Sequence, residues 1–145
     1  MKTHSRLFIA GLLLLSGGLA VADDRAYTEG SVVEVTYIRT RPGMFEDYMK
    51  WVGTQRKLEM EEMKKAGVIL SYSVYAASPR SPQEPDVILT VEYKNMAALD
   101  NLNAKVDPID AKIFGSVKAS DQANVDRGKL REVLGSELVR ELKLK

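Results

Sequence analysis

The sequence predicts a small α+β domain, and three observations carry this prediction. Short runs rich in β-branched and aromatic residues occupy 31–41, 68–77 and 86–93, and such residues favour strands. A long stretch with apolar residues three and four positions apart separates the first two runs, which is the spacing of an amphipathic helix. A longer helical region follows the third run and precedes an alternating segment at 137–144.

The first strand and the first helix are bounded by strong local signals. Pro42 and Gly43 end the strand. The helix is predicted over 44–66, with Gly67 as its C-terminal stop. Its charged residues, Arg56 and Glu59 among them, are expected on a solvated face. Its apolar stripe consists of Phe45, Tyr48, Met49, Val52, Met60 and Met63, widened by Trp51 and Leu58.

The second half of the chain completes the predicted element order. Residues 78–85 contain three prolines and form a loop, and Asn95 is a suitable N-cap. Residues 96–134 are expected to be helical in pieces, with boundaries at Asp107, Pro108, Asp121 and Gly135. The result is the ferredoxin-like arrangement βαββαβ, a four-stranded antiparallel sheet with helices on one face, here with an extra helical insertion before the last strand.

The N-terminus carries the three parts of a cleavable secretory signal over residues 1–22. A basic head and an apolar core precede a small-x-small cleavage site that ends at Ala22. An uncleaved membrane anchor is the alternative, although the apolar stretch is shorter than the roughly 20 residues that a spanning helix needs. We expect a periplasmic or secreted protein, with a flexible lead-in at 23–30 and a single domain at 31–145.

The composition excludes several kinds of chemistry. The chain has no cysteine, and its single histidine, His4, falls in the predicted leader. Ser-His-Asp and Cys-His nucleophilic sites are therefore excluded, and we expect no metal and no cofactor. Two of the 21 lysines and arginines also lie in the leader, so the remaining chain, with 20 acidic residues, has a net charge of −1. Such a charge does not attract nucleic acid or an anionic membrane.

Side-chain alternation assigns one row of each strand to the face that the helices cover. These rows are Val33, Val35, Tyr37 and Arg39; Val68, Leu70, Tyr72 and Val74; Val87, Leu89, Val91 and Tyr93; and Leu138, Arg140, Leu142 and Leu144. The opposite face mixes polar residues with Ile38, Ile69, Tyr75, Ile88 and Val139. That face must meet water or a partner. We expect a second copy of the chain there, giving a homodimer; the alternative is a monomer with scattered exposed apolar residues.

A family resemblance supports the same arrangement. The segment TYIRTRPGMFEDYMKW at 36–51 runs from a strand through Arg-Pro-Gly into an aromatic-bearing helix. It resembles the opening of dimeric α/β-barrel proteins, a superfamily that includes cofactor-free antibiotic-biosynthesis-type monooxygenases. The resemblance implies a dimer and a pocket between sheet and helices, but it does not imply one reaction. The chain lacks the histidine on which haem-binding members and some lyases of this superfamily rely.

The candidate site combines aromatic rings with arginines on the predicted helix-facing side. The candidate ligand-binding residues are Tyr37, Arg39, Tyr48, Trp51, Tyr72, Tyr93 and Arg140. Such a lining suits a flat acidic or phenolic small molecule, unless the tyrosine hydroxyls and the arginines simply reach water. Two functions follow: an exported dimeric domain that binds a small ligand or another protein, or a cofactor-free monooxygenase-like enzyme acting on such a molecule. No catalytic residue can be assigned.

Overall fold

The computed structural model describes residues 25–145, and it has the predicted order of elements. A strand, a long helix and two further strands come first, followed by short helices and a last strand. The elements are β1 (Tyr27–Thr40), α1 (Phe45–Trp51), the π-helical segment η1 (Val52–Arg56), α2 (Lys57–Lys65), β2 (Ser71–Ala76), β3 (Val87–Tyr93), the 3₁₀ turn η2 (Met96–Leu99), α3 (Leu102–Phe114), α4 (Val117–Arg127) and β4 (Arg131–Leu144).

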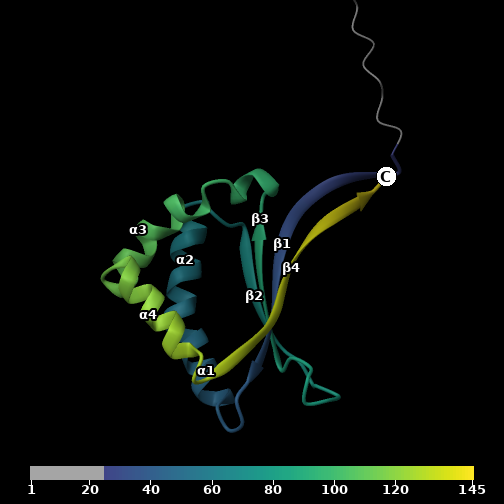
Figure 1. Ribbon diagram of the computed structural model, residues 1–145. Helices are drawn as coiled ribbons and strands as arrows, with labels where there is room; N and C mark the ends of the chain where they lie inside the picture. Colours follow the sequence, from purple (N-terminus) through teal and green to yellow (C-terminus); the bar gives the residue numbers. More distant parts are fainter. Residues whose placement is uncertain (1–24) are drawn as a thin grey trace, which may run out of the picture.

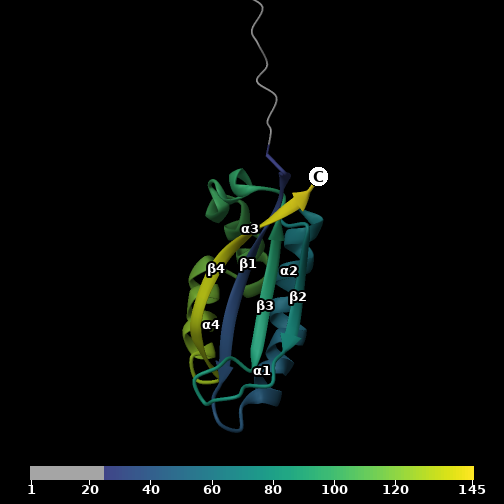
Figure 2. The same cartoon turned by 90° about the vertical axis from the view of Figure 1, so that its right-hand side faces the viewer.

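The four strands form one antiparallel sheet in the order β2-β3-β1-β4. This is the strand order of the ferredoxin-like fold, so the predicted fold class is confirmed. Figure 1 shows all helices on one side of the sheet, and Figure 2 shows the other side uncovered. Strands β1 and β4 are the longest, and they continue beyond β3 as a two-stranded ribbon (Figure 1).

The first helix is continuous from Phe45 to Lys65, but it contains a π-helical segment in its middle. The helix ends as predicted: Gly67 has a φ of 71°, a left-handed conformation that favours glycine. The backbone N–H groups of Gly67 and Val68 donate to the carbonyls of Lys64 and Met63 at 3.0 Å each. These two bonds form a Schellman motif, which satisfies carbonyls at the helix end.

The core lies between this helix and strands β2 and β3. One cluster packs around Tyr48 and Leu89, and a second packs around Met60, Met63 and Val91. All four apolar residues of β3 that were predicted to face the helices are buried, namely Val87, Leu89, Val91 and Tyr93. The assignment of faces on β3 is therefore confirmed.

The assignment of faces on β1 was wrong by one residue. Ile38 pairs with the buried Val87, and Val32 pairs with Tyr93, and paired residues of an antiparallel sheet point to the same side. The row that faces the helices is thus Val32, Glu34, Thr36 and Ile38, and the row Val33, Val35, Tyr37 and Arg39 lies on the open face. Both rows contain apolar residues, so alternation alone could not choose between them.

The ends of strands also differ from the prediction. Residues 27–30 of the expected flexible lead-in belong to β1. Residues 68–70 precede β2, and there Ile69 is buried whereas Leu70 is exposed, the reverse of the prediction. Gly135 does not end a helix but lies within β4, which begins at Arg131.

The helical insertion consists of α3 and α4, joined at Gly115. Asn95 caps the preceding 3₁₀ turn as predicted, since its side chain accepts from Ala98 N at 3.1 Å. Two predicted boundaries were wrong. Helix α3 runs through Pro108, and the residue that caps α4 is Ser116, whose hydroxyl accepts from Ala119 N at 3.1 Å, rather than Asp121.

Helix α3 packs on α2, and α4 packs on α3 rather than on the strands (Figure 1). The helix-facing side of β4 is therefore poorly covered. Leu138 lies opposite Glu34 on that side and is 48% exposed, and Leu142 and Leu144 are also exposed. The prediction that helices cover the leucine row of β4 was wrong, because the insertion stands away from the sheet.

The predicted signal peptide lies outside the described residues. Within residues 25–145, no helix has both the length and the apolar character needed to cross a membrane.

Candidate functional site

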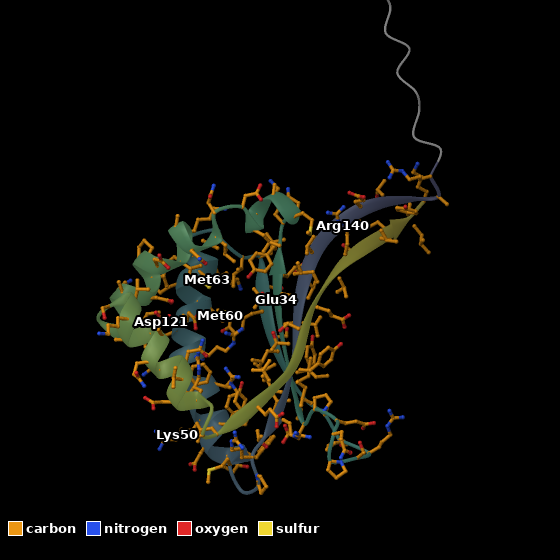
Figure 3. The ribbon with its side chains drawn as sticks, viewed as in Figure 1. Glu34, Lys50, Met60, Met63, Asp121 and Arg140 are labelled. Carbon is orange, nitrogen blue, oxygen red and sulfur yellow. The ribbon has the colours of Figure 1, made fainter. Side chains whose placement is uncertain are left out.

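A cavity of about 330 Å³ lies where α3 and α4 stand away from the sheet. Its floor comes from β1 and β3, and its walls come from the first helix, α3, the end of α4 and the start of β4. Figure 3 shows Glu34 on the strand side and Met60 and Met63 on α2 across from it. The lining residues are Glu34, Thr36, Ile38, Arg56, Glu59, Met60, Met63, Leu89, Val91, Tyr93, Leu102, Asn103, Val106, Asn124, Arg127 and Arg131.

Two arginines of the lining stand over aromatic rings of α1. The Arg127 guanidinium lies 4.1 Å from the centre of the Trp51 ring, and that of Arg131 lies 5.9 Å from the centre of the Tyr48 ring. The two rings are themselves stacked, with centroids 6.1 Å apart. Cation–π contacts of this kind hold a guanidinium by its flat face, so its N–H edge stays available to another group.

The arginines of the cavity have no carboxylate partner. Among residues 25–145, no carboxylate oxygen lies within 4.0 Å of a guanidinium nitrogen of Arg56, Arg127 or Arg131. The buried Nε atoms of Arg127 and Arg131 have no hydrogen-bond partner within this part of the chain. Arg131 makes one long contact, 3.5 Å from Nη2 to Asn124 Oδ1. Buried polar groups usually find partners, so these two side chains are unusual.

The charge balance of the cavity favours an anion. Burial, together with the neighbouring charge of Arg131, lowers the pKa of Arg127 to about 10, although Glu59 opposes the change. Arg127 remains a cation at neutral pH, but it is desolvated and repelled by a like charge. A negative group placed between the arginines would relieve both costs.

The two glutamates of the lining, Glu59 and Glu34, differ in their surroundings. Burial raises the pKa of Glu59, and nearby Arg56 and Arg127 only partly oppose this effect. Glu34 instead accepts a hydrogen bond from the Tyr93 hydroxyl at 3.4 Å. Burial, followed by the charge of Glu34, raises the pKa of Tyr93 to about 12, so its hydroxyl stays protonated. Neither carboxylate neutralises the arginines by direct contact.

Three of the sequence-predicted site residues belong to this region. Tyr93 lines the cavity, and Trp51 and Tyr48 lie beneath its arginines. Tyr48 is fully buried, and its hydroxyl has no hydrogen-bond partner within the described chain. Tyr72 is on the predicted side of β2, but its hydroxyl donates to Glu61 Oε1 at 2.6 Å and it does not line the cavity.

The other three predicted residues lie elsewhere. Tyr37 is on the open face, where its hydroxyl donates to Glu137 at 2.6 Å, and Arg39 is bound to Glu132 at 2.6 Å on that face. Arg140 pairs with Glu29 near the end of the β1–β4 ribbon, away from the cavity (Figure 3). The structure thus does not bring the seven candidates together.

Five charged residues that do line the cavity were not predicted, and one of them, Glu34, is on the row of β1 that was expected on the opposite face. Arg56 and Glu59 were expected on a solvated face, although Arg56 is four residues from both Val52 and Met60 of the apolar stripe. That spacing could have found it. Arg127 and Arg131 reach the cavity from the two sides of the turn between α4 and β4, and no local pattern indicates which way such a turn points its side chains.

The donor set suits an organic anion better than a cation. Within residues 25–145, no group of three or more acidic or histidine side chains is close enough to hold a metal ion. Guanidinium groups bind carboxylates through paired N–H donors, and the methionine, leucine and valine side chains of the lining offer an apolar surface beside them.

Comparisons with known proteins agree on the fold. The sequence matches no family model and no curated protein. The structure defines an α+β protein of ferredoxin-like topology. It is similar to HapK from Hahella chejuensis, with 12% identity and a TM-score of 0.53 over 76% of this chain and 91% of that one. It is also similar to a protein from Shewanella oneidensis, with 14% identity and a TM-score of 0.52 over 81% and 96%. At these identities the likeness concerns the fold alone.

Proposed function

We propose that this chain is a binding domain for a small organic molecule, which it holds in the cavity between the sheet and the helices. The observation that carries the proposal is the set of three arginines around the cavity that have no carboxylate partner in the described part of the chain. The cavity volume, about 330 Å³, is at the lower end of the range of ligand sites, roughly 300–1,000 Å³.

A bulky substitution inside the cavity tests this proposal. Val106 lines the cavity from α3, whereas Val125 on α4 is 71% exposed. The unmodified protein should gain thermal stability with some members of a small-molecule library, because a ligand that binds only the native state raises the melting temperature. Val106→Trp should lose these shifts, and Val125→Trp should keep them. Shifts that survive Val106→Trp would place binding elsewhere.

We further propose that the domain works as a homodimer through its open sheet face. This face carries Val33 and Val35 on β1 and Ile88 on β3, together with Tyr75 and Val139, which are 54% and 41% exposed. It is more apolar than the sequence had suggested, because the row of β1 that contains two valines lies here. A second copy would bury these residues by face-to-face sheet packing. Together with the fold, such a dimer would agree with the dimeric α/β-barrel resemblance.

The dimer is tested by charging the open face. Val35→Lys should yield a folded monomer, since the new side chain is solvated in the monomer and buried in the dimer. Val117→Lys on α4 is the matched control and should leave the dimer intact. Sedimentation velocity at several concentrations measures both. An unmodified protein that sediments as a monomer at high concentration would contradict the proposal.

We also propose that the domain is exported. The signal-like sequence at 1–22 supports this proposal. N-terminal sequencing of the protein from the periplasm or the medium should find Asp23 first. Recovery of the full-length chain from the cytoplasm alone would exclude export.

A further inference from the structure

We propose that the cavity selects a carboxylate with an apolar body, and that Arg127 and Arg131 bind the carboxylate. This inference rests on the proposed binding function and names the class of ligand. It comes from the arrangement of charged and apolar groups within the cavity.

The anion-binding end is prearranged by the stacked rings of α1. The two guanidiniums lie over the rings of Trp51 and Tyr48, and such contacts position them without using their N–H donors. The buried Nε atoms of both arginines have no partner in the described chain. A planar fork held in this way matches the two oxygens of a carboxylate.

The charge of this end is positive even with the acidic residues included. The lining contains three arginines and two glutamates. Burial raises the pKa of one of these, Glu59, so it carries its negative charge less readily than an exposed glutamate. The other, Glu34, bonds to Tyr93. One organic anion would bring the charge of the cavity close to neutrality.

Beside its charged residues and the polar Thr36, Asn103 and Asn124, the cavity has an apolar wall. Met60 and Met63 come from α2, Leu89 and Val91 from β3, and Leu102 and Val106 from α3. Methionine side chains adapt to ligands of different shape. We therefore expect an apolar body in the ligand, since an inorganic ion alone would leave this wall without contacts.

Three matched probes test the inference. The probes are 3-phenylpropanoate, 3-phenylpropanol and 3-phenylpropylamine, which share one body and differ in charge. Trp51 is the only tryptophan of the chain, and it lies under Arg127, so its fluorescence reports on the anion-binding end. The carboxylate should bind at least about tenfold more tightly than the alcohol, because a hydrogen bond to a charged group contributes about 1.5–3 kcal/mol. The amine should bind least.

Substitutions of the arginines complete the test, with calorimetry as the measure since it does not depend on Trp51. Arg127→Gln and Arg131→Gln should each reduce the preference for the carboxylate over the alcohol by about tenfold or more. Arg80→Gln removes the same charge from the exposed loop and should leave this preference unchanged.

Two outcomes would contradict the inference. Equal affinity for all three probes, with binding lost in Val106→Trp, would overturn the anion preference and leave the binding function standing. Binding of none would count against both.

Discussion

The two halves of the sheet differ in what covers their helix-facing side. The half formed by β2 and β3 lies under the first helix, and its side chains supply most of the strand residues of the two core clusters, with Ile38 of β1 added to one of them. The half formed by β1 and β4 has Glu34 and Thr36 on the same side, and Leu138 next to them is 48% exposed. The helix-facing side of the sheet is thus a closed core toward the β2 edge and an open cavity wall toward the β4 edge.

The difference has an identifiable structural cause. In a ferredoxin-like fold, the second crossover helix can cover the strands that the first helix leaves free. Here that connection contains two helices: α3 packs on α2, and α4 packs on α3. Polar residues on β1 are tolerated because no helix dehydrates them fully. We infer that the β2–β3 half supplies most of the core, and that the poorly covered β1–β4 half leaves room for the site, which β3 also lines.

A matched pair of leucine substitutions is the strongest test of this comparison. Leu89 on β3 is 6% exposed and Leu138 on β4 is 48% exposed, and both face the helices. Leu89→Ala should reduce the free energy of unfolding by about 2–5 kcal/mol, since it leaves a cavity in the core. Leu138→Ala should cost less than about 1 kcal/mol. Urea unfolding at one fixed protein concentration measures both, because dimerisation would make stability depend on concentration.

Equal losses from the two substitutions would contradict the comparison. That outcome would mean that the β4 side is covered in solution. A change in the dependence of the unfolding free energy on urea would show instead that a variant alters the unfolded state.

The same contrast explains how much of the fold the sequence could predict. On β3, the helix-facing row holds only Val87, Leu89, Val91 and Tyr93, and the other row includes Thr90 and Glu92, so one assignment is clearly better. On β1, apolar residues occur on both rows, with Val33 and Val35 on one and Val32 and Ile38 on the other. Periodicity cannot orient such a strand. The burial of one row by its neighbours decides the matter, and that is a tertiary effect.

The site was less predictable than the fold for a related reason. Aromatic residues were predicted to line the site, yet the hydroxyls of Tyr37 and Tyr72 donate hydrogen bonds to Glu137 and Glu61 outside the cavity. The residues that define the cavity, Arg127 and Arg131, are more than 70 positions from Trp51 and Tyr48 in the chain. Only the packing of α4 against the first helix brings them together.

A second, smaller effect on stability is expected from Glu59, which lines the cavity. Burial raises the pKa of Glu59 above its ordinary value of 4.5, while Arg56 and Arg127 oppose the shift and Asp110 adds to it. The folded state therefore binds the proton more tightly than the unfolded state. The resulting loss of stability is absent below the unfolded pKa and develops as pH rises through that value to the folded pKa.

Glu59→Gln should consequently raise the free energy of unfolding at about pH 7, and this gain should disappear toward about pH 4. Urea unfolding across that range measures it. Glu46→Gln at the start of α1 is a control, since this exposed carboxylate does not line the cavity. A gain of the same size for both variants would mean that net charge, and not burial in the cavity, is responsible.

The smallest expected effect concerns the ion pair that ties the insertion to the first helix. Lys112 on α3 donates to Glu62 on α2, and this contact lowers the pKa of Glu62. The folded state binds the proton less tightly, so the pair stabilises the protein above the unfolded pKa, and the effect is lost as pH falls through the folded pKa. Glu62→Gln should therefore remove a modest stabilisation at neutral pH and leave the free energy of unfolding unchanged in acid.

Glu84→Gln is the matched control, because the pKa of Glu84 is also lowered, by Arg80 within one loop. Amide hydrogen exchange separates the two pairs: only Glu62→Gln should speed exchange in α3 and α4, since only that pair joins the insertion to α2. Unchanged exchange in both helices would mean that apolar contacts between α3 and α2 alone hold the cavity open.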